Sequence, residues 1–274
     1  MMTCMKIKKE KKQKPVFLSG FLIIVFLCGF INCLGVDYYM IATSSMMPTI
    51  QAGQRITINK FIYGIRIVFK KNTNNYKLIR TKGIRTIEPN DVICFNKPQG
   101  DLKRTSLFTD SDVYCKRILG TPGDRIGAVD GHYWNEKILR PIGIVEEQEK
   151  LRWMFDGVFV WNDTFDVFAE SGLGWNIKNW GPLIVPAKGM TIHLHENNRE
   201  LYRHVIEYET GMELGNIDTY TFCDNYYFAV GDNVMNSNDS RYWGFVPADY
   251  IIGVVSGWKG SRNNKSVFEA EIGE

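Results

Sequence analysis

The side chains best suited to covalent chemistry are a serine in a hydroxyl-rich turn and a lysine far downstream. Ser45 lies in the segment 43–50, which reads Thr-Ser-Ser-Met-Met-Pro-Thr-Ile and is held stiff by Pro48. A serine hydroxyl is a weak nucleophile and needs a nearby base. Histidine is the usual helper, but all four histidines lie in the stretch 132–204, and none is beside a candidate nucleophile. A Ser-His-Asp enzyme is therefore disfavoured.

Lysine is the other side chain that can act as the base. Lys116 lies in the middle of the apolar run 113–119. An ordinary lysine has a pKa of about 10.4 and is almost fully charged at neutral pH, but burial among apolar groups penalises the ammonium form. On the inner face of a strand, Lys116 could therefore be neutral and accept the Ser45 proton. The alternative is a lysine that extends to solvent from a strand edge.

A polar block near the C-terminus could orient such a buried amine. Residues 231–244 are rich in Asp, Asn, Ser and Gly and end in aromatic residues and a glycine. One interpretation is a polar turn between two strands, with a surface ion pair between Asp239 and Arg241. The other is a rigid wall whose hydroxyls satisfy the amine of Lys116.

A metal site is disfavoured. His193 and His195 would share one face of a strand, a spacing that suits a metal ion. No third ligand is spaced to complete that site. We expect both histidines at the surface or in packing, and we expect no metal or organic cofactor.

A mainly β architecture must position these residues. Short apolar or alternating segments separated by Gly, Pro and Asp turns predict strands. Their expected ranges are 55–60, 91–95, 113–119, 191–194, 220–222, 226–230 and 251–255. Many short strands of this kind are typical of an antiparallel β-sheet and not of alternating β-α units.

Two segments show helical spacing instead. They are 146–155 and 198–208, the second with Asn198 as the expected N-cap. Both lie in 131–219, which we interpret as a β-rich subdomain with short helices. It would be inserted into a catalytic β domain formed by residues 37–130 and 220–260, and a polar tail, 261–274, would end the chain.

The N-terminal end predicts a membrane anchor. Residues 1–15 carry six lysines and one acid, and residues 16–36 form an apolar run long enough to cross a bilayer as one helix. Lysines beside such a run favour the cytoplasmic side, so we expect the N-terminus inside and everything after Asp37 outside. A cleavable signal is the alternative, but its apolar region is usually only about 7–15 residues long.

Composition excludes some functions. The formal net charge of +3 mostly reflects the lysine-rich tail, so there is no basic footprint for nucleic acid. The content of 45% hydrophobic and 13% aromatic residues predicts a folded core. Cys94, Cys115 and Cys223 would lie outside the membrane, widely spaced and without a Cys-x-x-Cys pair. We expect neither a disulfide framework nor cysteine chemistry from them.

Three blocks in this order resemble those of the bacterial type I signal peptidases (leader peptidases). They are Ser-Met-Met-Pro-Thr at 45–49, Lys-Arg-Ile-Leu-Gly-Thr-Pro-Gly-Asp at 116–124, and the block 231–244, from Gly-Asp-Asn to Ser-Arg-Tyr-Trp-Gly. The segment 91–95 resembles the intervening strand block of that family more weakly. With the expected anchor, the resemblance covers residues 16 to about 255.

The resemblance implies a serine endopeptidase with a Ser/Lys dyad. Ser45 would be the nucleophile and Lys116 the general base. The hydroxyl of Thr43 would help the Ser45 backbone N–H to hold the oxyanion. Residues that flank the dyad are candidate walls of the pockets for small substrate side chains: Ile41, Met46 and Tyr114.

The third block would support the dyad. Ser237 matches the serine that hydrogen-bonds the catalytic lysine, and Asp239 with Arg241 matches a supporting ion pair. The chain departs from the family pattern at Thr43, where serine is commoner, and at Met235, where an acid is frequent.

The implied function is removal of N-terminal signal peptides from exported preproteins at the bacterial inner membrane, by a single-pass enzyme. Its partners would be those preproteins and the lipid bilayer, with an export translocon as a further expected partner. Two alternatives stay open. One is a Ser/Lys processing peptidase dedicated to a specific substrate, of the conjugation-linked type. The other is a non-catalytic membrane-anchored β-domain that binds export partners.

Overall fold

The computed structural model describes residues 34–72, 75–96, 113–153 and 173–259. The chain forms two compact units, Met1–Gly35 and Val36–Glu274. The expected anchor at 16–36 lies outside the described residues except for its last three positions, of which Leu34 and Gly35 are helical and Val36 begins a strand. None of the helices in the described part of the chain has the length and apolar character that a membrane span requires.

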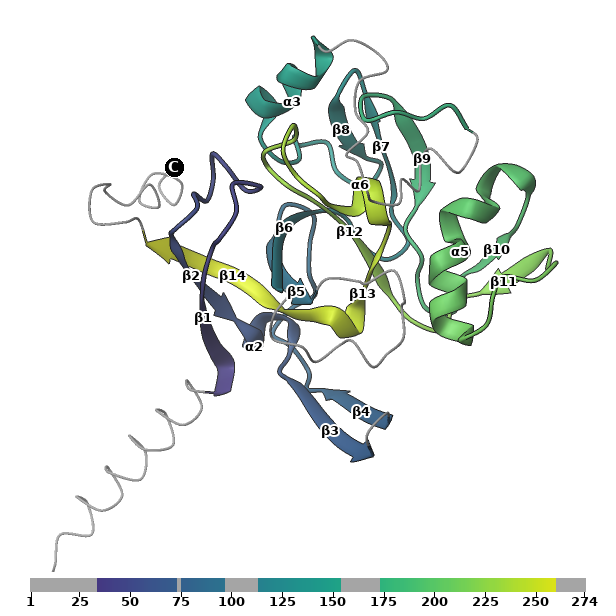
Figure 1. Ribbon diagram of the computed structural model, residues 1–274, viewed down its shortest axis with the longest axis horizontal. Coiled ribbons are helices and arrows are strands. Elements are labelled where there is room, and N and C mark those ends of the chain that lie inside the picture. The colour runs from purple at the N-terminus through teal and green to yellow at the C-terminus, as the bar shows by residue number, and fades with distance from the viewer. Residues whose placement is uncertain (1–33, 73–74, 97–112, 154–172, 260–274) are drawn as a thin grey trace, which may run out of the picture. The chain divides into compact units, whose positions relative to one another are not determined.

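The second unit is built on one antiparallel sheet that carries the site (Figure 1). Its seven strands have the spatial order β1-β2-β14-β5-β6-β12-β13. Their bounds are β1 Val36–Met40, β2 Arg55–Asn59, β5 Val92–Asn96, β6 Val113–Gly120, β12 Tyr226–Val230, β13 Val246–Pro247 and β14 Ile251–Lys259. The main sheet thus joins segments from both ends of the unit, as strand pairing in an antiparallel fold permits.

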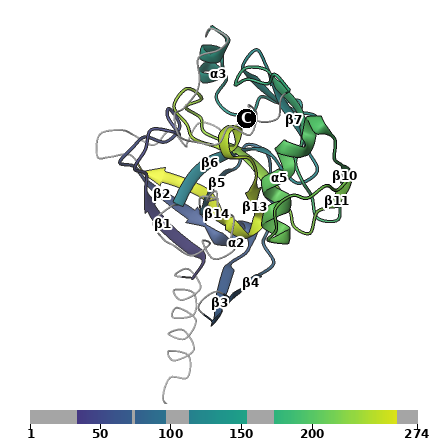
Figure 2. The same cartoon turned by 45° about the vertical axis from the view of Figure 1, so that its right-hand side comes forward.

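Three smaller sheets and several short helices complete the unit (Figure 2). The sheets pair β3 Arg66–Asn72 with β4 Asn75–Arg80, β10 Thr191–His193 with β11 Thr219–Thr221, and β7 Arg125–Val129 with both β8 His132–Asn135 and β9 Trp180–Ile184. The helices are α2 Lys60–Tyr63, α3 Val145–Arg152, α5 Glu196–Thr210 and α6 Ser240–Trp243, with a 3₁₀ turn, η2, at Ala248–Tyr250. The division into a catalytic domain and an inserted subdomain at 131–219 stays a prediction.

All seven expected strands are present, with ends that differ by a few residues. The prediction of a mainly β, antiparallel fold is confirmed. Six further strands, apart from the two-residue β13, were not predicted, with β1 hidden at the end of the apolar run: β1, β3, β4, β7, β8 and β9. The β3–β4 hairpin has no glycine or proline at its turn to signal it.

The two expected helices are present, but one cap was misplaced. The segment 146–155 overlaps α3, which spans Val145–Arg152, and 198–208 lies within α5. Helix α5 begins earlier than expected, because its N-cap is His195 and not Asn198. Asn198 instead lies in the first turn, where its side-chain oxygen accepts a hydrogen bond from the His195 backbone N–H at 2.7 Å. This reciprocal contact is the second half of a capping box.

The smaller of two apolar clusters supports the site. It joins the segment 41–50 to strands β2, β5, β6 and β14. Each of its buried residues has less than one tenth of its surface exposed: Ile41, Met46, Ile50, Ile56, Ile58, Val92, Cys94, Cys115 and Ile252. Full burial of a side chain such as Met46 or Ile50 stabilises the fold by about 1.5–3 kcal/mol. The hydroxyl-rich turn is therefore seated on the sheet by its apolar members.

Candidate active site

The turn that carries Ser45 is rigid in its backbone. Met47 N–H donates to Ser44 O at 3.1 Å, and Ile50 N–H donates to Met46 O at 2.9 Å. Met46 and Ile50 of this turn are buried, whereas Thr43, Met47 and Pro48 are exposed. Ser45 itself keeps 9% of its surface exposed, so its hydroxyl remains reachable.

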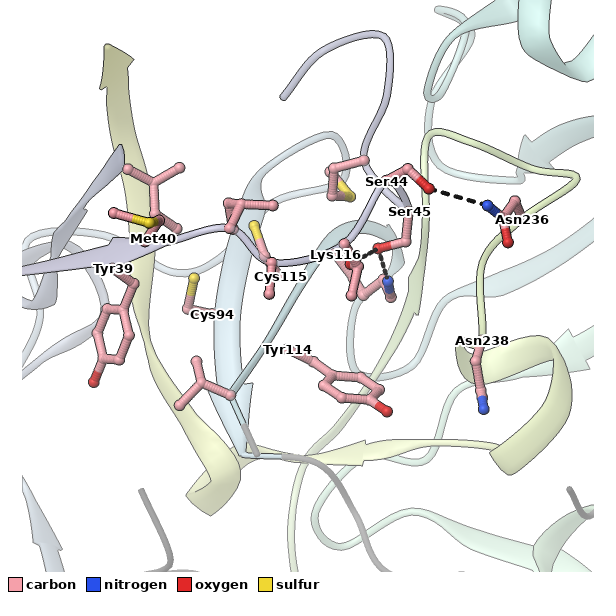
Figure 3. A pocket seen from close by; sticks show the side chains of 16 residues that line it. Tyr39, Met40, Ser44, Ser45, Cys94, Tyr114, Cys115, Lys116, Asn236 and Asn238 are labelled. Atoms are coloured by element: carbon pink, nitrogen blue, oxygen red, sulfur yellow. Dashed lines mark hydrogen bonds between the residues drawn. The ribbon is translucent and has the colours of Figure 1, made fainter. Parts of the chain in front are cut away.

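Strand β6 delivers Lys116 to that hydroxyl. Lys116 pairs with Ile93 of β5 in the sheet, and its Nζ lies 2.5 Å from Ser45 Oγ. The lysine is 3% exposed, so the alternative of a lysine extending to solvent is wrong. Figure 3 shows the amine and the hydroxyl pointing toward one another from β6 and from the turn. These two residues, 71 positions apart in sequence, form one hydrogen-bonded pair.

Burial controls the charge of this amine. Loss of solvent lowers the pKa of Lys116 below its usual range, and the negative charge of Asp239 opposes that shift. Asp239 is itself held by the guanidinium of Arg241, whose positive charge further lowers the lysine pKa. The neutral amine, which is the form that can accept a proton, is thereby favoured.

The Asp239–Arg241 pair is buried and not a surface pair. Arg241 Nε donates to Asp239 Oδ1 and Nη2 donates to Oδ2, both at 2.7 Å. Both residues have at most 2% of their surface exposed. Burial raises the pKa of Asp239, but the Arg241 charge and hydrogen bonds outweigh it, so the pKa of this carboxyl is lowered overall. Asp239 also caps α6 and accepts from Gly231 N–H at 2.8 Å, so the pair fixes the shape of the third block.

Thr43 and Ser237 lie beside the dyad but differ in their exposure and in their hydrogen bonds. Thr43 Oγ1 lies 3.2 Å from Ser45 Oγ, on the exposed side of the turn. Ser237 is 2% exposed, yet its Oγ has no hydrogen-bond partner among the described residues. The expected hydrogen bond between Ser237 and Lys116 is therefore not formed in this structure. The oxyanion role of Thr43 and the supporting role of Ser237 stay predictions.

Asparagines of the third block, 231–244, hold the nucleophile turn, 43–50, in place. These contacts were not predicted from the sequence. Asn233 N–H donates to Ser45 O at 3.0 Å, and Asn233 Nδ2 donates to Ser44 O at 3.1 Å. Asn236 Nδ2 donates to Ser44 Oγ at 3.0 Å, as Figure 3 shows. The density of Asn in 231–244 was the available signal, because amide side chains commonly bridge to backbone groups in turns.

A second ion pair, between the partly buried Arg117 and the buried Asp232, was also missed. Arg117 Nε and Nη2 donate to the two carboxylate oxygens of Asp232, each at 2.7 Å, and Thr49 Oγ1 donates to the same carboxylate. Arg117 Nη1 also donates to Asn90 O at 3.0 Å. This bidentate pair ties β6, the nucleophile turn and the third block together. Thr49, Arg117 and Asp232 each belong to a different one of the three sequence blocks, and the sequence gives no other indication of this contact.

An open cleft of about 440 Å³ runs over the dyad. Ile41, Met46 and Tyr114, the expected wall residues, line it together with the dyad. The ring centroid of Tyr114 lies 5.6 Å from Lys116 Nζ. Other lining residues come from β1, β2, β5, β6 and the third block: Tyr39, Met40, Ile56, Cys94, Val113, Cys115, Asn236 and Asn238. The cleft leads directly to the Ser45 hydroxyl.

The histidines stand apart from this site. His193 and His195 stack with their ring centroids 6.5 Å apart, and His132 Nε2 lies 3.0 Å from Glu149 Oε1. In the described part of the chain, no group of three or more His, Cys, Asp or Glu side chains is placed to hold a metal ion.

Comparison with known proteins identifies the family. The model of the family described as signal peptidase, peptidase S26, matches residues 16–258. Signal peptidase I of Buchnera aphidicola subsp. Baizongia pistaciae (strain Bp) is 28% identical over 263 residues, which cover 90% of this chain and 76% of that protein. Signal peptidase I of Pseudomonas aeruginosa PAO1 is 26% identical over 261 residues, which cover 89% and 73%.

A crystal structure of a signal peptidase I from Enterococcus faecalis V583 is also similar, at a TM-score of 0.31 and 18% identity, covering 63% of this chain and 98% of that one. A likeness of this size carries no weight, so the assignment depends on the sequence matches. They define the class of the protein as a serine endopeptidase. The chain belongs to the signal peptidase family, peptidase S26, and its activity is the removal of signal peptides.

Proposed function

We propose that this chain removes signal peptides with Ser45 as its nucleophile and Lys116 as its general base. The observation that carries the proposal is the 2.5 Å separation of Lys116 Nζ and Ser45 Oγ in a buried, cleft-facing position. A base must lie within hydrogen-bond reach of the group whose proton it takes, about 2.6–3.2 Å between heavy atoms. At 2.5 Å, Lys116 Nζ and Ser45 Oγ are already in hydrogen-bond contact before substrate binds.

The first half-reaction forms an acyl-enzyme. The Ser45 hydroxyl donates its proton to the neutral amine of Lys116 while Oγ attacks the carbonyl carbon of the last signal-peptide residue. The ammonium then gives that proton to the amine of the departing mature protein as the C–N bond breaks. Asp239 stabilises the transient positive charge, because its carboxylate acts on Lys116 in the direction that raises the lysine pKa.

The second half-reaction reverses these roles. A water gives a proton to Lys116 and attacks the acyl carbon. The bond to Ser45 Oγ breaks, and Oγ recovers its proton from the ammonium, which releases the signal peptide as a free acid. One amine serves both steps, so no metal or organic cofactor is needed.

Two donors would hold the oxyanion. The backbone N–H of Ser45 is one, and the Thr43 hydroxyl, already 3.2 Å from Ser45 Oγ, is the other. A single donor of this kind contributes about 3 kcal/mol to transition-state stabilisation. Threonine keeps the donor of the commoner serine but has fewer available rotamers.

The cleft walls would select the residues before the scissile bond. Ile41 and Met46 are buried, apolar and part of one packed cluster, so they present a firm surface with little room for side chains. Tyr114 is partly buried at the other side of the dyad. A substrate with small side chains near its cleavage site fits these walls best.

The predicted anchor would place this chemistry at the membrane. With the N-terminus inside, residues after 37 would face the outside, where signal peptides of exported preproteins end. Confinement of enzyme and substrate to one bilayer raises their effective concentration and orients the cut. The lipid bilayer, and an export translocon that delivers the preprotein, are the proposed partners.

Replacement of the nucleophile tests the proposal. Ser45→Ala in the full-length protein in detergent should lower kcat/KM for preprotein cleavage on the order of 10⁶-fold, with an unchanged melting temperature. Ser256→Ala, at an exposed position of β14, is the matched control and should cleave normally. Cleavage that survives in Ser45→Ala would show that another group is the nucleophile.

A further inference from the structure

Two thiols face each other in the floor of the cleft. Cys94 of β5 and Cys115 of β6 are direct partners in the antiparallel register, although 21 residues separate them in sequence. Both are free cysteines, and both line the cleft that leads to the dyad, as Figure 3 shows. Catalysis by Ser45 and Lys116 uses neither of them.

Their backbone positions suit a disulfide bond. Hydrogen-bonded and non-hydrogen-bonded positions alternate along an antiparallel pair. Ile118 N–H donates to Asp91 O, so counting along the register puts Cys94 and Cys115 at a non-hydrogen-bonded position. There the Cα atoms are about 4.5 Å apart, within the range of about 4.4–6.8 Å that a disulfide spans. Strands β5 and β6 need little rearrangement to accept the bond.

The two thiols differ in access. Cys94 has no exposed surface, whereas Cys115 retains 8%. Burial, together with a hydrogen bond to Cys115, raises the pKa of the Cys94 thiol well above its usual range, so Cys94 stays protonated. A reagent that enters the cleft therefore meets Cys115 first and Cys94 only afterwards.

We propose that Cys115 is a modification site for low-molecular-weight disulfides, and that Cys94 resolves the adduct into an intramolecular disulfide that stops peptide cleavage. In the first step the Cys115 thiolate attacks the reagent disulfide, whose S–S bond breaks and releases one thiol. In the second step the Cys94 sulfur attacks the Cys115 sulfur and its proton passes to the departing thiolate, which leaves as the second thiol. The two cysteines lose two electrons and two protons, and the reagent disulfide is reduced to two thiols.

Either product would obstruct the substrate. The adduct would occupy the cleft beside Lys116, the neighbour of Cys115 in β6. The disulfide would turn both cysteine side chains toward each other, with little change in the backbone, and so alter the packing of the cluster that includes Ile41 and Met46, the proposed pocket walls. The effect on cleavage rests on the proposed function, because it requires that substrate bind in this cleft; the thiol chemistry does not. An extracytoplasmic location would supply the oxidising surroundings in which disulfides persist.

The test uses the full-length protein in detergent with its other four cysteines, at positions 4, 28, 33 and 223, replaced by alanine. After complete reduction, oxidised glutathione is added, remaining thiols are alkylated, and the digest is read by mass spectrometry. We expect a peptide pair joined through Cys94 and Cys115. We also expect a loss of preprotein cleavage on the order of 100-fold, the scale of a misplaced reacting group, that dithiothreitol reverses.

Single variants separate the two thiols. In Cys94→Ala, the reaction should stop at the glutathione adduct on Cys115. In Cys115→Ala, Cys94 should stay unmodified, and the cleavage rate should be the same with and without oxidised glutathione. Alkylation of both thiols after oxidation, an adduct on Cys94 in Cys115→Ala, or full cleavage by the cross-linked protein would overturn the proposal. A reduced protein that fails to cleave would refute the proposed function instead, while the cross-link still decides the thiol chemistry.

Discussion

Gly231→Ala is the sharpest test of how the third block and the nucleophile turn fit together. A methyl group at residue 231 would lie 2.5 Å from Ser45 O, 2.5 Å from Ser237 Cβ and 2.1 Å from Ser237 Oγ. The Ser237 hydroxyl can rotate away, because it has no hydrogen-bond partner among the described residues, but the contact with Ser237 Cβ remains. The Ser45 carbonyl is held in place by the hydrogen bond that it accepts from Asn233 N–H at 3.0 Å.

The magnitude follows from the shift that is needed. To restore ordinary contact, Ser45 O must move by about 1 Å relative to residue 231, which shifts the Ser45 backbone from its present position relative to Lys116. A displacement of this size costs about 100-fold in rate, and overpacking of the buried contact costs about 1–3 kcal/mol of stability. We therefore expect kcat/KM to fall about 100-fold, with a lower melting temperature.

The assay compares cleavage of one preprotein by Gly231→Ala and by Gly257→Ala. A methyl group at 257 would meet nothing within 4 Å, so that variant controls for the change of residue type. Initial rates below KM give kcat/KM, and thermal unfolding separates lost stability from lost rate. Equal cleavage by the two variants would refute the argument that residue 231 must lack a side chain for Ser45 to be placed.

Three further predictions concern charge at the site. Lys116→Arg should abolish cleavage, because a guanidinium stays protonated at any working pH. The control is Lys188→Arg, at an exposed position, which should cleave normally. An active Lys116→Arg enzyme would exclude the lysine as base. The rate should rise with pH as Lys116 loses its proton, with a midpoint below the ordinary lysine pKa because burial lowers it; a pH–rate profile that is flat or falls across neutral pH would contradict this. Arg241→Met should destabilise the fold by about 3–5 kcal/mol by leaving the buried Asp239 carboxylate unpaired, and an unchanged denaturant midpoint would show that the pair is not needed.

The pairing of Ser45 with Lys116 could be predicted because the proposed chemistry depends on residue type. A serine without a usable histidine and a lysine inside an apolar strand left few ways to activate a nucleophile, and the family blocks supplied the pairing. The seven expected strands followed from alternation and turn residues in the same way. Strand β1 was not predicted from these signals. Its first residue continues the apolar run of the expected anchor, so periodicity cannot mark where the apolar run ends and the strand begins.

The contacts that hold the site could not be predicted because they depend on register. Asp232 and Arg117 became partners only when β6 and the loop after β12 were placed side by side. The same is true of Cys94 and Cys115, which look unrelated in sequence and face each other once β5 and β6 pair. A shift of one residue in that register would turn each side chain to the opposite face.

Strand β1 has a mechanical consequence for the nucleophile. The ladder from Val36–Asn59 to Met40–Arg55, continued by Ile41 N–H to Gln54 O, stands between residue 36 and the serine turn. A pull on the chain at residue 36 would load these bonds in shear before any strain arrived at Ser45. Ser44 and Ser45 are held by hydrogen bonds from asparagines of the opposite loop, so tension from an attached segment would leave the Ser45 hydroxyl oxygen in place.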